Sequence, residues 1–260
     1  MKTLNQNISP DISIVTVCFN SENFIETNIN SVNQQDYRNI EQIFIDGGSS
    51  DSTVQKIKTL SKSNTTLVSE TDHGIYNAMN KGLSLARGTY VVFLNSDDFF
   101  ENRFALNDVV KIAQNIEPDV ITSNIRYVNR LDTEKVIRIW RVGKFSLRKL
   151  RNGWMAPHPG TFIRRNILNE VGGFDENYNI SGDYDLFVRI TRLQDIKVYT
   201  LNKFTVRMRT GGVSNGSFKT ILAKMREDRR VIKSNGIGNI LTLVMKNLRK
   251  ITQFYLHSFR

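Results

Sequence analysis

The stretch GIYNAMNKGLSLARGTYVVFLNSDD, residues 74–98, carries the patterns of a helix, a strand and two adjacent acids in succession. Its first part has apolar residues at helical spacing: Ile75, Met79, Leu83 and Ala86. Gly88 follows as a typical residue beyond the end of a helix. The run TYVVFLN (89–95) is apolar and β-branched, which is typical of a strand buried on both faces. The stretch therefore predicts a helix–strand unit with Asp97 and Asp98 just beyond the carboxyl end of its strand.

The same alternation of strand and helix patterns precedes this unit. Three further apolar runs predict buried strands: ISIVTVCF (12–19), EQIFID (41–46) and TTLVSE (65–70). The helices between them are predicted from apolar residues at helical spacing: Ile25, Ile29 and Val32, then Val54, Ile57 and Leu60. This order predicts an α/β fold, with an open, mostly parallel sheet and helices on both faces.

Acidic residues gather at the predicted carboxyl ends of these strands: Asp46, Glu70, Asp72, Asp97 and Asp98. Ligands of open parallel sheets bind at this edge, so the acids mark a candidate site. Two common nucleotide motifs, G-x-G-x-x-G after the first strand and G-x-x-x-x-G-K-[ST], are absent. A divalent cation between carboxylates and phosphates is another way to hold a diphosphate, and Mg²⁺ and Mn²⁺ suit it. Asp97 and Asp98 are the predicted metal ligands; in the alternative interpretation, Asp97 caps a turn and Asp98 is solvated.

The second half of the chain has mixed patterns. Strands are predicted at 119–124, 134–140, 196–201 and 203–209, and helices at 164–171 and 183–193. Residues 145–160 look irregular, 210–217 form a Gly/Ser loop, and the remainder has the pattern of a helix.

The composition is that of a folded protein: of 260 residues, 40% are hydrophobic and 23% charged. A net charge of +11 favours anionic partners, and the single Cys18 argues against a disulfide scaffold and for a reducing compartment. The N-terminus lacks the apolar segment of a signal peptide, and no apolar run is long enough to span a membrane. We expect a cytoplasmic protein, soluble or peripheral on the inner face of the cell membrane.

Five segments resemble, in order and spacing, the family-2 glycosyltransferases of the GT-A fold. They are SIVTVCFN (13–20), FIDGGSSDST (44–53), DHGIYNAMNKGLSLARGTYVVFLNSDD (72–98), HPGTFIRR (158–165) and VGGFDENYNISGDYDLFVRI (171–190). The resemblance covers about residues 12–215 and is to the branch of bacterial polysaccharide, lipopolysaccharide and glycolipid assembly. It implies an inverting, metal-dependent hexosyltransferase that moves a sugar from a nucleotide-sugar donor, with UDP as the expected nucleotide. The implied acceptor is a hydroxyl of a saccharide or lipid-linked saccharide.

The resemblance also implies which residues contact the donor: Val17, Phe19, Asp46, Asp72, Asn80, Lys81, Asn95, Ser96 and Asp97. Val17 and Phe19 match the loop that approaches the base, and Asp46 matches an acid that hydrogen-bonds it. The alternative role of Asp46, which precedes Gly47, is to stabilise a turn. The alternative for Lys81 is a position on a solvated helix face with no contact to the donor.

The metal-binding motif of the family is D-x-D, and Asp97 corresponds to its last acid. Asn95 stands where the first Asp often stands, which leaves Asp97 as the anchor and Asp98 in reserve. His158, between two prolines, is a further candidate for the metal or the diphosphate, with a structural role as the alternative. The implied cofactor is Mn²⁺ or Mg²⁺.

Asp183 matches the catalytic base of the family, because inverting transfer needs a carboxylate that accepts the proton of the acceptor hydroxyl. Its alternative is a helix N-cap, and Asp185 is expected to pair with Arg189 at i, i+4. The loop RTGGVSNGS (209–217) resembles a segment that closes over the donor, and Arg207 or Arg209 is a candidate for the diphosphate.

The C-terminal residues 216–260 predict a basic helical extension to a domain of residues 1–215. Within that domain, 12–100 would bind the nucleotide-sugar and 101–215 would hold the acceptor and the base. One stripe of the last helix is apolar: Leu241, Val244, Leu248, Ile251, Tyr255 and Phe259. Lys246, Arg249, Lys250 and His257 lie opposite it. Residues 240–260 are therefore expected on an anionic membrane surface, or docked on their own domain or on a second subunit in a homodimer.

Two other functional classes are consistent with parts of the sequence. A catalytically silent nucleotide-sugar or glycan-binding module on the same scaffold would have no need of Asp183. A nucleic-acid binder would use the positive charge, but the predicted strand ends are acidic where aromatic stacking would be needed, so we expect no nucleic-acid partner.

Overall fold

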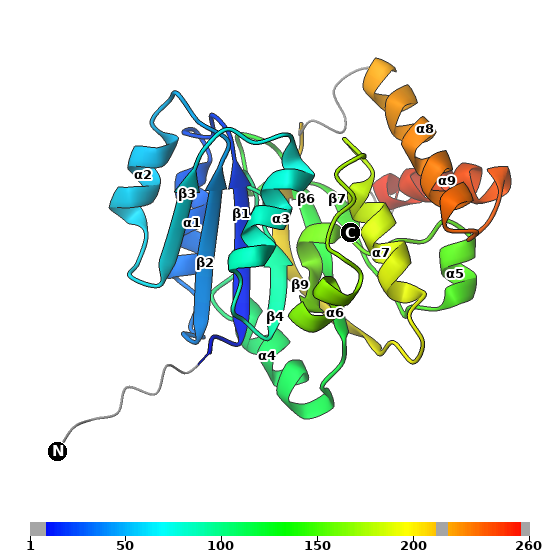
Figure 1. Ribbon diagram of the computed structural model, residues 1–260, viewed down its shortest axis with the longest axis horizontal. Helices are drawn as coiled ribbons and strands as arrows, with labels where there is room; N and C mark the ends of the chain where they lie inside the picture. Colours follow the sequence, from blue (N-terminus) through cyan, green and yellow to red (C-terminus); the bar gives the residue numbers. More distant parts are fainter. Residues whose placement is uncertain (1–8, 212–217, 256–260) are drawn as a thin grey trace.

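The four N-terminal strands lie parallel and form one half of a single sheet in a computed structural model, which describes residues 9–211 and 218–255. They are β1 (Ile12–Cys18), β2 (Ile40–Asp46), β3 (Thr65–Ser69) and β4 (Tyr90–Phe93), in the order β3-β2-β1-β4 (Figure 1). Cys18 pairs with Asp46, and Asp46 pairs with Ser69, so these three strands end side by side. The register brings the residues that follow each strand to one edge of the sheet.

Three helices connect these strands, as the periodicity predicts: α1 (Ile25–Asn33), α2 (Thr53–Leu60) and α3 (Ile75–Leu85). Ile25 and Ile29 of α1 are fully buried, and Ile57 of α2 is 1% exposed. In α3, Met79 and Leu83 are buried as predicted, but Ile75 is 43% exposed. The α/β character of the N-terminal half is confirmed.

The second half continues the same sheet with antiparallel and parallel neighbours. The order proceeds from β4 through β8 (Thr161–Arg164), β6 (Val120–Val128) and β9 (Val198–Arg209) to β5 (Phe99–Phe100), and β7 (Val136–Trp140) pairs with β6. The strands predicted at 196–201 and 203–209 are one strand, because β9 stays paired with β6 through a register irregularity near Asn124. The strands β5 and β8 and the helix α4 (Ala105–Ile116) lie outside the predicted elements.

Short helices fill the rest of this half: α5 (Leu147–Arg151), the 3₁₀ turn η1 (His158–Gly160), α6 (Arg165–Glu170) and α7 (Gly182–Thr191). The predicted loop at 210–217 falls mostly on residues 212–217, outside the described residues, as does the predicted domain boundary at 215/216.

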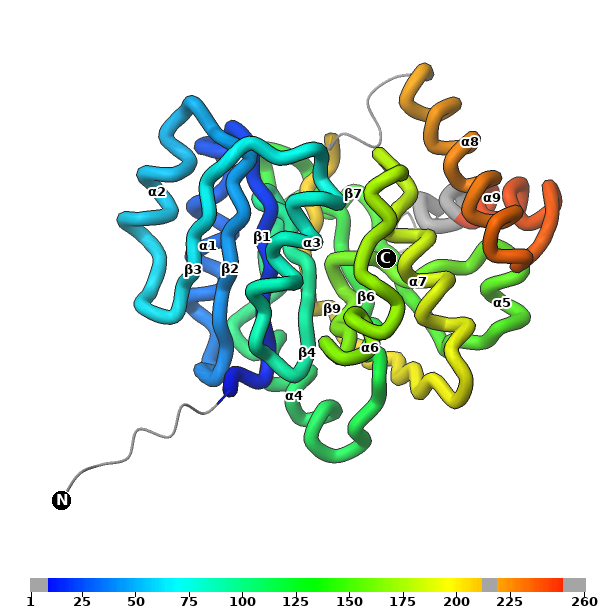
Figure 2. The backbone as a smooth tube through the Cα atoms, viewed as in Figure 1, coloured from blue at the N-terminus to red at the C-terminus, as the bar shows by residue number. Residues whose placement is uncertain are grey.

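The two C-terminal helices, α8 (Phe218–Ser234) and α9 (Ile240–Tyr255), pack on the domain (Figures 1 and 2). Helix α8 contacts α7, and α9 contacts both α8 and β7. Val231 of α8 and Leu243 of α9 belong to the same hydrophobic core as Val15 of β1. The alternative in which the last helix docks on its own domain is therefore the one that the structure shows.

Helix α9 docks with the face opposite to the predicted apolar stripe. Thr242 and Lys246 are buried, and the Thr242 hydroxyl donates to the carbonyl oxygen of Arg151 at 2.7 Å. By contrast, the stripe residues Leu241 and Val244 are 63% and 47% exposed. The side chains of Lys250, Ile251 and Tyr255, and residues 256–260 with His257 and Phe259, are outside the description. None of the helices in the described ranges is long and apolar enough to cross a membrane.

Candidate active site

Phe19 and Asp72 flank the backbone of Gly47 at the carboxyl ends of β1, β2 and β3. A Cβ built on Gly47 would lie 2.6 Å from Asp72 Oδ2 and 3.5 Å from Phe19 Cδ2, so a side chain there would displace the Asp72 carboxylate. Phe19 is 63% exposed although it is a large aromatic residue, and Val17 at the end of β1 is partly buried. The structure thus brings together Phe19 and Asp72, two of the residues predicted to contact the donor.

Asp46 is fully buried and its carboxylate is occupied by the protein itself. It accepts hydrogen bonds from Gly48 N (3.2 Å), Ser49 N (3.0 Å) and Ser69 Oγ (2.6 Å), and from the Ser49 hydroxyl. Burial and the neighbouring Asp46 raise the pKa of the Cys18 thiol well above its ordinary value. The structure therefore favours the turn-stabilising role of Asp46 over direct contact with a base.

Asn80 connects α3 to the segment around Phe174, and Lys81 reaches the carboxyl end of β3. Asn80 Nδ2 donates to Phe174 O (2.9 Å) and to Glu176 Oε1 (2.8 Å), and Asn80 Oδ1 accepts from Phe174 N (2.8 Å). The Lys81 ammonium pairs with Glu70 at 2.7 Å. The polar groups of Asn80 and Lys81 thus have partners within the protein, and their contact with the donor stays a prediction.

The loop after β4 is fixed by residues of α1 and of the segment that precedes α1. Asn28 Nδ2 donates to the carbonyl oxygens of Asn95 (2.9 Å) and Asp98 (3.0 Å), and the hydroxyls of Ser21 and Ser96 lie 2.9 Å apart. Asn28 is fully buried, so this loop is tied into the core.

Asp98 is buried with both carboxylate oxygens in hydrogen bonds. Its Oδ1 accepts from Arg209 N (3.1 Å) and its Oδ2 accepts from Asn95 Nδ2 (3.2 Å). Burial and the adjacent Asp97 raise the pKa of Asp98 well above its ordinary value. Asp98 is therefore not solvated, which contradicts that alternative, and both of its oxygens have protein partners, so its role as a metal ligand in reserve stays a prediction.

Asp97 is the member of the pair that a ligand can reach, with 23% of its side chain exposed and Oδ2 3.5 Å from Arg130 Nη1. Burial raises its pKa, and Arg130 and Arg209 act against that increase. Asn95 Oδ1 is buried and has no hydrogen-bond partner among the described residues.

These oxygen donors can be tested against a divalent cation. Within residues 9–211 and 218–255 no group of three or more His, Cys, Asp or Glu side chains is placed to hold a metal. Mg²⁺, however, is commonly held by one or two carboxylates together with substrate phosphates and water. The carboxylate of Asp97 and the unpartnered oxygen of Asn95 fit a cation that takes its other ligands from a diphosphate.

The two arginines expected near a diphosphate have other partners. Arg209 Nη1 donates to the carbonyl oxygen of Asp97 at 2.8 Å, and its guanidinium is buried. Arg207 Nη1 pairs with Glu134 at 3.0 Å and its Nε lies 3.4 Å from Glu101. Both hold the β5–β9 side of the sheet in place.

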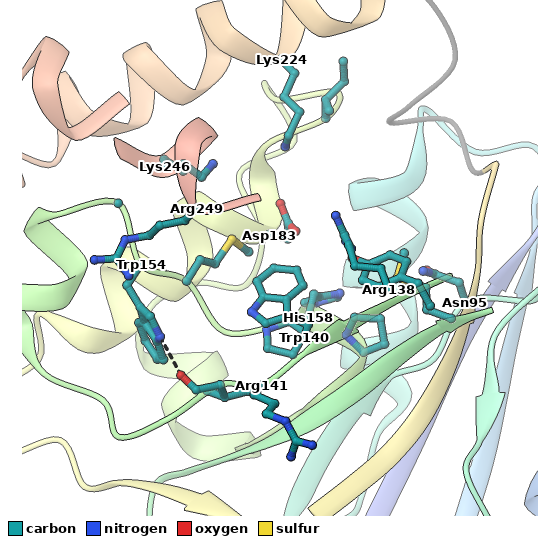
Figure 3. Close-up of a pocket in the computed structure, with 18 of the residues that line it drawn as sticks. Asn95, Arg138, Trp140, Arg141, Trp154, His158, Asp183, Lys224, Lys246 and Arg249 are labelled. Carbon is teal, nitrogen blue, oxygen red and sulfur yellow. Dashed lines mark hydrogen bonds between the residues drawn. The ribbon is translucent and has the colours of Figure 1, made fainter. Parts of the chain in front are cut away.

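A cavity of about 390 Å³ joins the end of β4 to the start of α7, since both Asn95 and Asp183 line it. Asp183 is in the first turn of α7, and its Oδ1 accepts from Tyr184 N at 2.8 Å. The helix start is held close to α3, because a Cβ built on Gly182 would lie 2.7 Å from the Tyr76 ring. Figure 3 shows the Asp183 carboxylate within the group of lining side chains.

Asp185, two residues later, faces away from this cavity and serves the fold. Its carboxylate pairs with Arg189 at 2.7 Å, as the i, i+4 spacing predicts, and accepts from Asn235 Nδ2 at 3.0 Å.

His158 lies in the cavity wall and in the aromatic core at once. Its ring stacks on Phe93 at 5.3 Å and meets the edge of Phe174 at 5.6 Å between ring centroids. Nε2 is buried with no hydrogen-bond partner in the part of the chain that the structure describes, and burial lowers the pKa of the imidazole, so the neutral form is favoured. Its packing gives it a structural role, and its place in the wall keeps it close to Asp183.

Several cavity residues were not recognised in the sequence. Arg138 and Trp140 come from β7, Lys224 from α8 and Lys246 from α9 (Figure 3). Their local patterns are those of an exposed strand face and of solvated helix faces. Only the docking of α8 and α9 on the domain brings them to the same cavity as Asp183.

Residues 13–172 match the family described as Glycosyl transferase family 2. An uncharacterized glycosyltransferase of Mycobacterium tuberculosis is 32% identical over 186 residues, which is 70% of this chain and 69% of that protein.

Solved structures show the same fold. The crystal structure of S. aureus TarS 1–349 in complex with UDP has a TM-score of 0.65 at 21% identity, covering 85% of this chain and 65% of that chain. The mannosyltransferase PcManGT from Pyrobaculum calidifontis, in complex with GDP-Man and Mn²⁺, has a TM-score of 0.63 at 18% identity, covering 88% and 64%. The predicted GT-A fold is confirmed.

Proposed function

The chain belongs to glycosyl transferase family 2, and from this premise we propose that it transfers a hexose with inversion from a UDP-sugar to a hydroxyl of a saccharide or lipid-linked saccharide. Glycosyl transfer follows from the family; the donor, the acceptor and the stereochemistry are our proposal. We place the reaction in the assembly of cell-surface polysaccharide or glycolipid.

The observation that carries this proposal is the cavity shared by Asn95 and Asp183. Asn95 follows the carboxyl end of β4, and ligands of open α/β sheets bind at such strand ends. Asp183 contributes a carboxylate to the same cavity from the first turn of α7. A base and a donor must meet in one space for direct displacement, and this cavity supplies that space.

In the proposed reaction, Asp183 accepts the proton of the acceptor hydroxyl as that oxygen bonds to the anomeric carbon of the donor sugar. The bond from the anomeric carbon to the diphosphate oxygen breaks with its electron pair, so the nucleoside diphosphate leaves as an anion. The closeness of Gly182 to Tyr76 keeps the Asp183 carboxylate aimed at the cavity.

The proposed donor contacts are Val17, Phe19, Asp72, Asn95, Ser96 and Asp97. Phe19 and Asp72 would hold the base beside Gly47, and Asp46 would support them by fixing the turn. The likeness to TarS in complex with UDP supports the uridine nucleotide. The division of labour between residues 12–100 for the donor and 101–215 for the base is part of the same proposal.

We assign the metal to Asp97, with the side-chain oxygen of Asn95 as its second protein ligand. Bound Mn²⁺ or Mg²⁺ would act as a Lewis acid that stabilises negative charge on the leaving diphosphate. The likeness to PcManGT, which was solved with GDP-Man and Mn²⁺, supports a metal.

Calorimetric titration of UDP and GDP, with and without Mn²⁺, tests the donor and the metal together. We expect UDP to bind more tightly than GDP and only with Mn²⁺, and Asp97→Ala to abolish that binding. Glu26→Ala, an exposed acid on α1, is the matched control and should bind as the parent does. Absence of binding by either nucleotide under both conditions would contradict the proposal.

The C-terminal helices support a peripheral position on the inner face of the cell membrane. Large apolar side chains on these helices are exposed: Ile221, Leu222, Met225, Ile240, Leu241, Val244 and Leu248. We call these residues the apolar C-terminal surface. Basic residues on the same helices would add attraction to anionic lipids. A second copy of the chain is the alternative occupant of this surface.

A further inference from the structure

The wall of the cavity around Asp183 is strongly positive. In the described part of the chain, Asp183 is the only carboxylate among its lining residues, against six basic residues. These are Arg138, Arg141, Lys149, Lys224, Lys246 and Arg249. The Arg141 guanidinium lies over the Phe204 ring and points away from Asp183 (Figure 3), and the Lys149 ammonium donates to Lys144 O. A concave, partly dry wall with one dominant charge sign concentrates ligands of the opposite sign. The proposed reaction uses none of these six cations.

Two of these basic residues, Lys224 and Lys246, lie next to a single buried acid, Asp228. Asp228 is fully buried and accepts from the Lys246 ammonium at 2.5 Å and from Ser181 Oγ at 2.8 Å. The Lys224 ammonium lies 4.0 Å from the same Asp228 oxygen, beyond hydrogen-bonding distance. One carboxylate thus faces two ammonium groups, which leaves net positive charge at the cavity surface.

The position of these cations separates them from the donor end. In Figure 3, Asn95 and Arg249 lie at opposite sides of the cavity, with Asp183 between them, and Lys224 and Lys246 lie above Asp183. Lys246 and Arg249 of α9 are therefore beyond the base when viewed from the donor strand, and Lys224 of α8 lies directly above the base. An acceptor whose hydroxyl reaches Asp183 would extend into this part of the cavity.

Aromatic residues complete this side of the wall. Trp140 is partly exposed and stacks on Tyr127 at 6.4 Å between ring centroids, and Trp154 is held by a hydrogen bond from its Nε1 to Val142 O at 2.9 Å. Both indoles line the cavity. A rigid aromatic face beside polar groups suits the apolar face of a sugar ring.

Resting on the proposed function, we infer that the acceptor is an anionic saccharide, whose phosphate or carboxylate group binds Lys224 and the adjacent basic wall while a sugar ring packs on Trp140. The anion can belong to a sugar residue of the glycan or to the phosphate that links a saccharide to a carrier lipid. Lys224 is the specificity-determining residue, since its ammonium is directed at the cavity and lies 4.0 Å from the Asp228 carboxylate, too far for a hydrogen bond.

Tryptophan fluorescence tests this inference directly, because the chain has two tryptophans and both line the cavity. The full-length protein is titrated, without any donor, with glucose 1-phosphate, glucose 6-phosphate, glucuronate and glucose. The first mimics a carrier-linked phosphate, the second and third mimic charged residues within a glycan, and glucose is the neutral reference. We expect at least one charged sugar to bind about tenfold or more tighter than glucose.

Variants of α8 identify the residue responsible. Lys224→Gln should weaken binding of the charged sugar by about tenfold or more, the loss expected for one hydrogen bond to a charged group, and leave glucose binding unchanged. Lys233→Gln removes the same charge from an exposed position of the same helix and should bind as the parent does. Unchanged melting temperatures show that both variants are folded.

Three results would overturn the inference. Equal affinity for glucose and for all three charged sugars would remove the role of charge, and equal affinity for inorganic phosphate would remove saccharide recognition. Displacement of the charged sugar by UDP would assign the cations to the donor. Because this titration needs no donor, its failure is distinguishable from failure of the transferase proposal, which would appear as absent UDP binding.

Discussion

Asp97 and Asp98 are neighbours in the chain, but their carboxylates have different surroundings. Asp98 accepts hydrogen bonds from Arg209 N and Asn95 Nδ2 inside the core, whereas Asp97 is partly exposed beside Arg130. A strand end followed by two acids therefore yields one structural and one accessible carboxylate. The accessible one is the residue on which the proposed metal depends.

Asp183 and Asp185 form a second such pair, and they permit a matched test. Asp183→Asn should lower kcat by about 10²- to 10⁴-fold, because the amide cannot accept the proton of the acceptor hydroxyl. UDP affinity should stay within twofold or so of the parent, since the base does not contact the nucleotide in the proposed site. Steady-state kinetics and calorimetry measure the two quantities.

Asp185→Asn is the control with the same change two residues away. It should reduce the free energy of unfolding through the Arg189 and Asn235 contacts while leaving kcat near that of the parent. Equal loss of kcat in both variants would show that the helix start, and not the Asp183 base, is what the first substitution disturbed. Full activity of Asp183→Asn would contradict the proposed base.

At the scale of elements, one buried ion pair joins α8 to α9. Lys246 is 5% exposed and Asp228 is fully buried. Burial lowers the pKa of Lys246 to about 8. Burial also acts to raise the pKa of Asp228, but Lys246 and Lys224 outweigh it, so that pKa is lowered. Burying either charge alone would cost free energy, and each charge offsets that cost for the other. The pair therefore fixes which face of α9 points inward.

A double-mutant cycle checks this account. Lys246→Met or Asp228→Asn alone should lower the free energy of unfolding by about 3 kcal/mol, because each leaves a buried partner uncompensated. The double variant should lose clearly less than the sum, since no unpaired charge remains. Urea unfolding measures all four proteins, with Lys233→Met as an exposed control expected within about 0.5 kcal/mol of the parent. Simple additivity of the two losses would show that the pair does not hold the helices together.

At the scale of the whole molecule, the C-terminal helices do two things with opposite faces. Their inner faces share the core with the sheet and supply cavity residues, while their outer faces expose the apolar C-terminal surface. Removing the last helix would therefore strip both the core and the cavity wall. Substitutions on the outer face are the cleaner test of membrane association.

We predict that the triple variant Leu241→Gln, Val244→Gln and Leu248→Gln binds vesicles containing anionic lipid at least about tenfold more weakly than the parent. Its melting temperature should be unchanged, because the three side chains are exposed in the protein. Co-sedimentation measures binding, and a rise in salt should weaken it for the parent. Equal vesicle binding by both proteins would contradict the membrane role. A parent dimer that the triple variant lacks would assign the surface to a second copy.

The sequence by itself determined the parallel half of the sheet and its helices, because local periodicity and strand length are sufficient to specify them. It also determined where Asp97 and Asp183 would lie in the fold. Asp97 follows the end of a strongly patterned strand, and Asp183 lies at the start of a strongly patterned helix. The elements outside the prediction show the limit: β5 has two residues and β8 has four, and each exists by pairing with strands far away in the sequence.

Only the tertiary structure decided which charged residues are buried and which face a ligand. The periodicity of 240–255 shows that two faces of the helix differ, but not which one docks. Lys246 can be buried because Asp228, 18 positions earlier in the chain, accepts a hydrogen bond from its ammonium group where α9 docks on α8. In the same way, Asp46 and Asp98 are occupied by partners that the fold brings to them from other strands and loops. Burial of a charge depends on non-local partners, so the basic residues of α8 and α9 line the cavity only in the folded molecule.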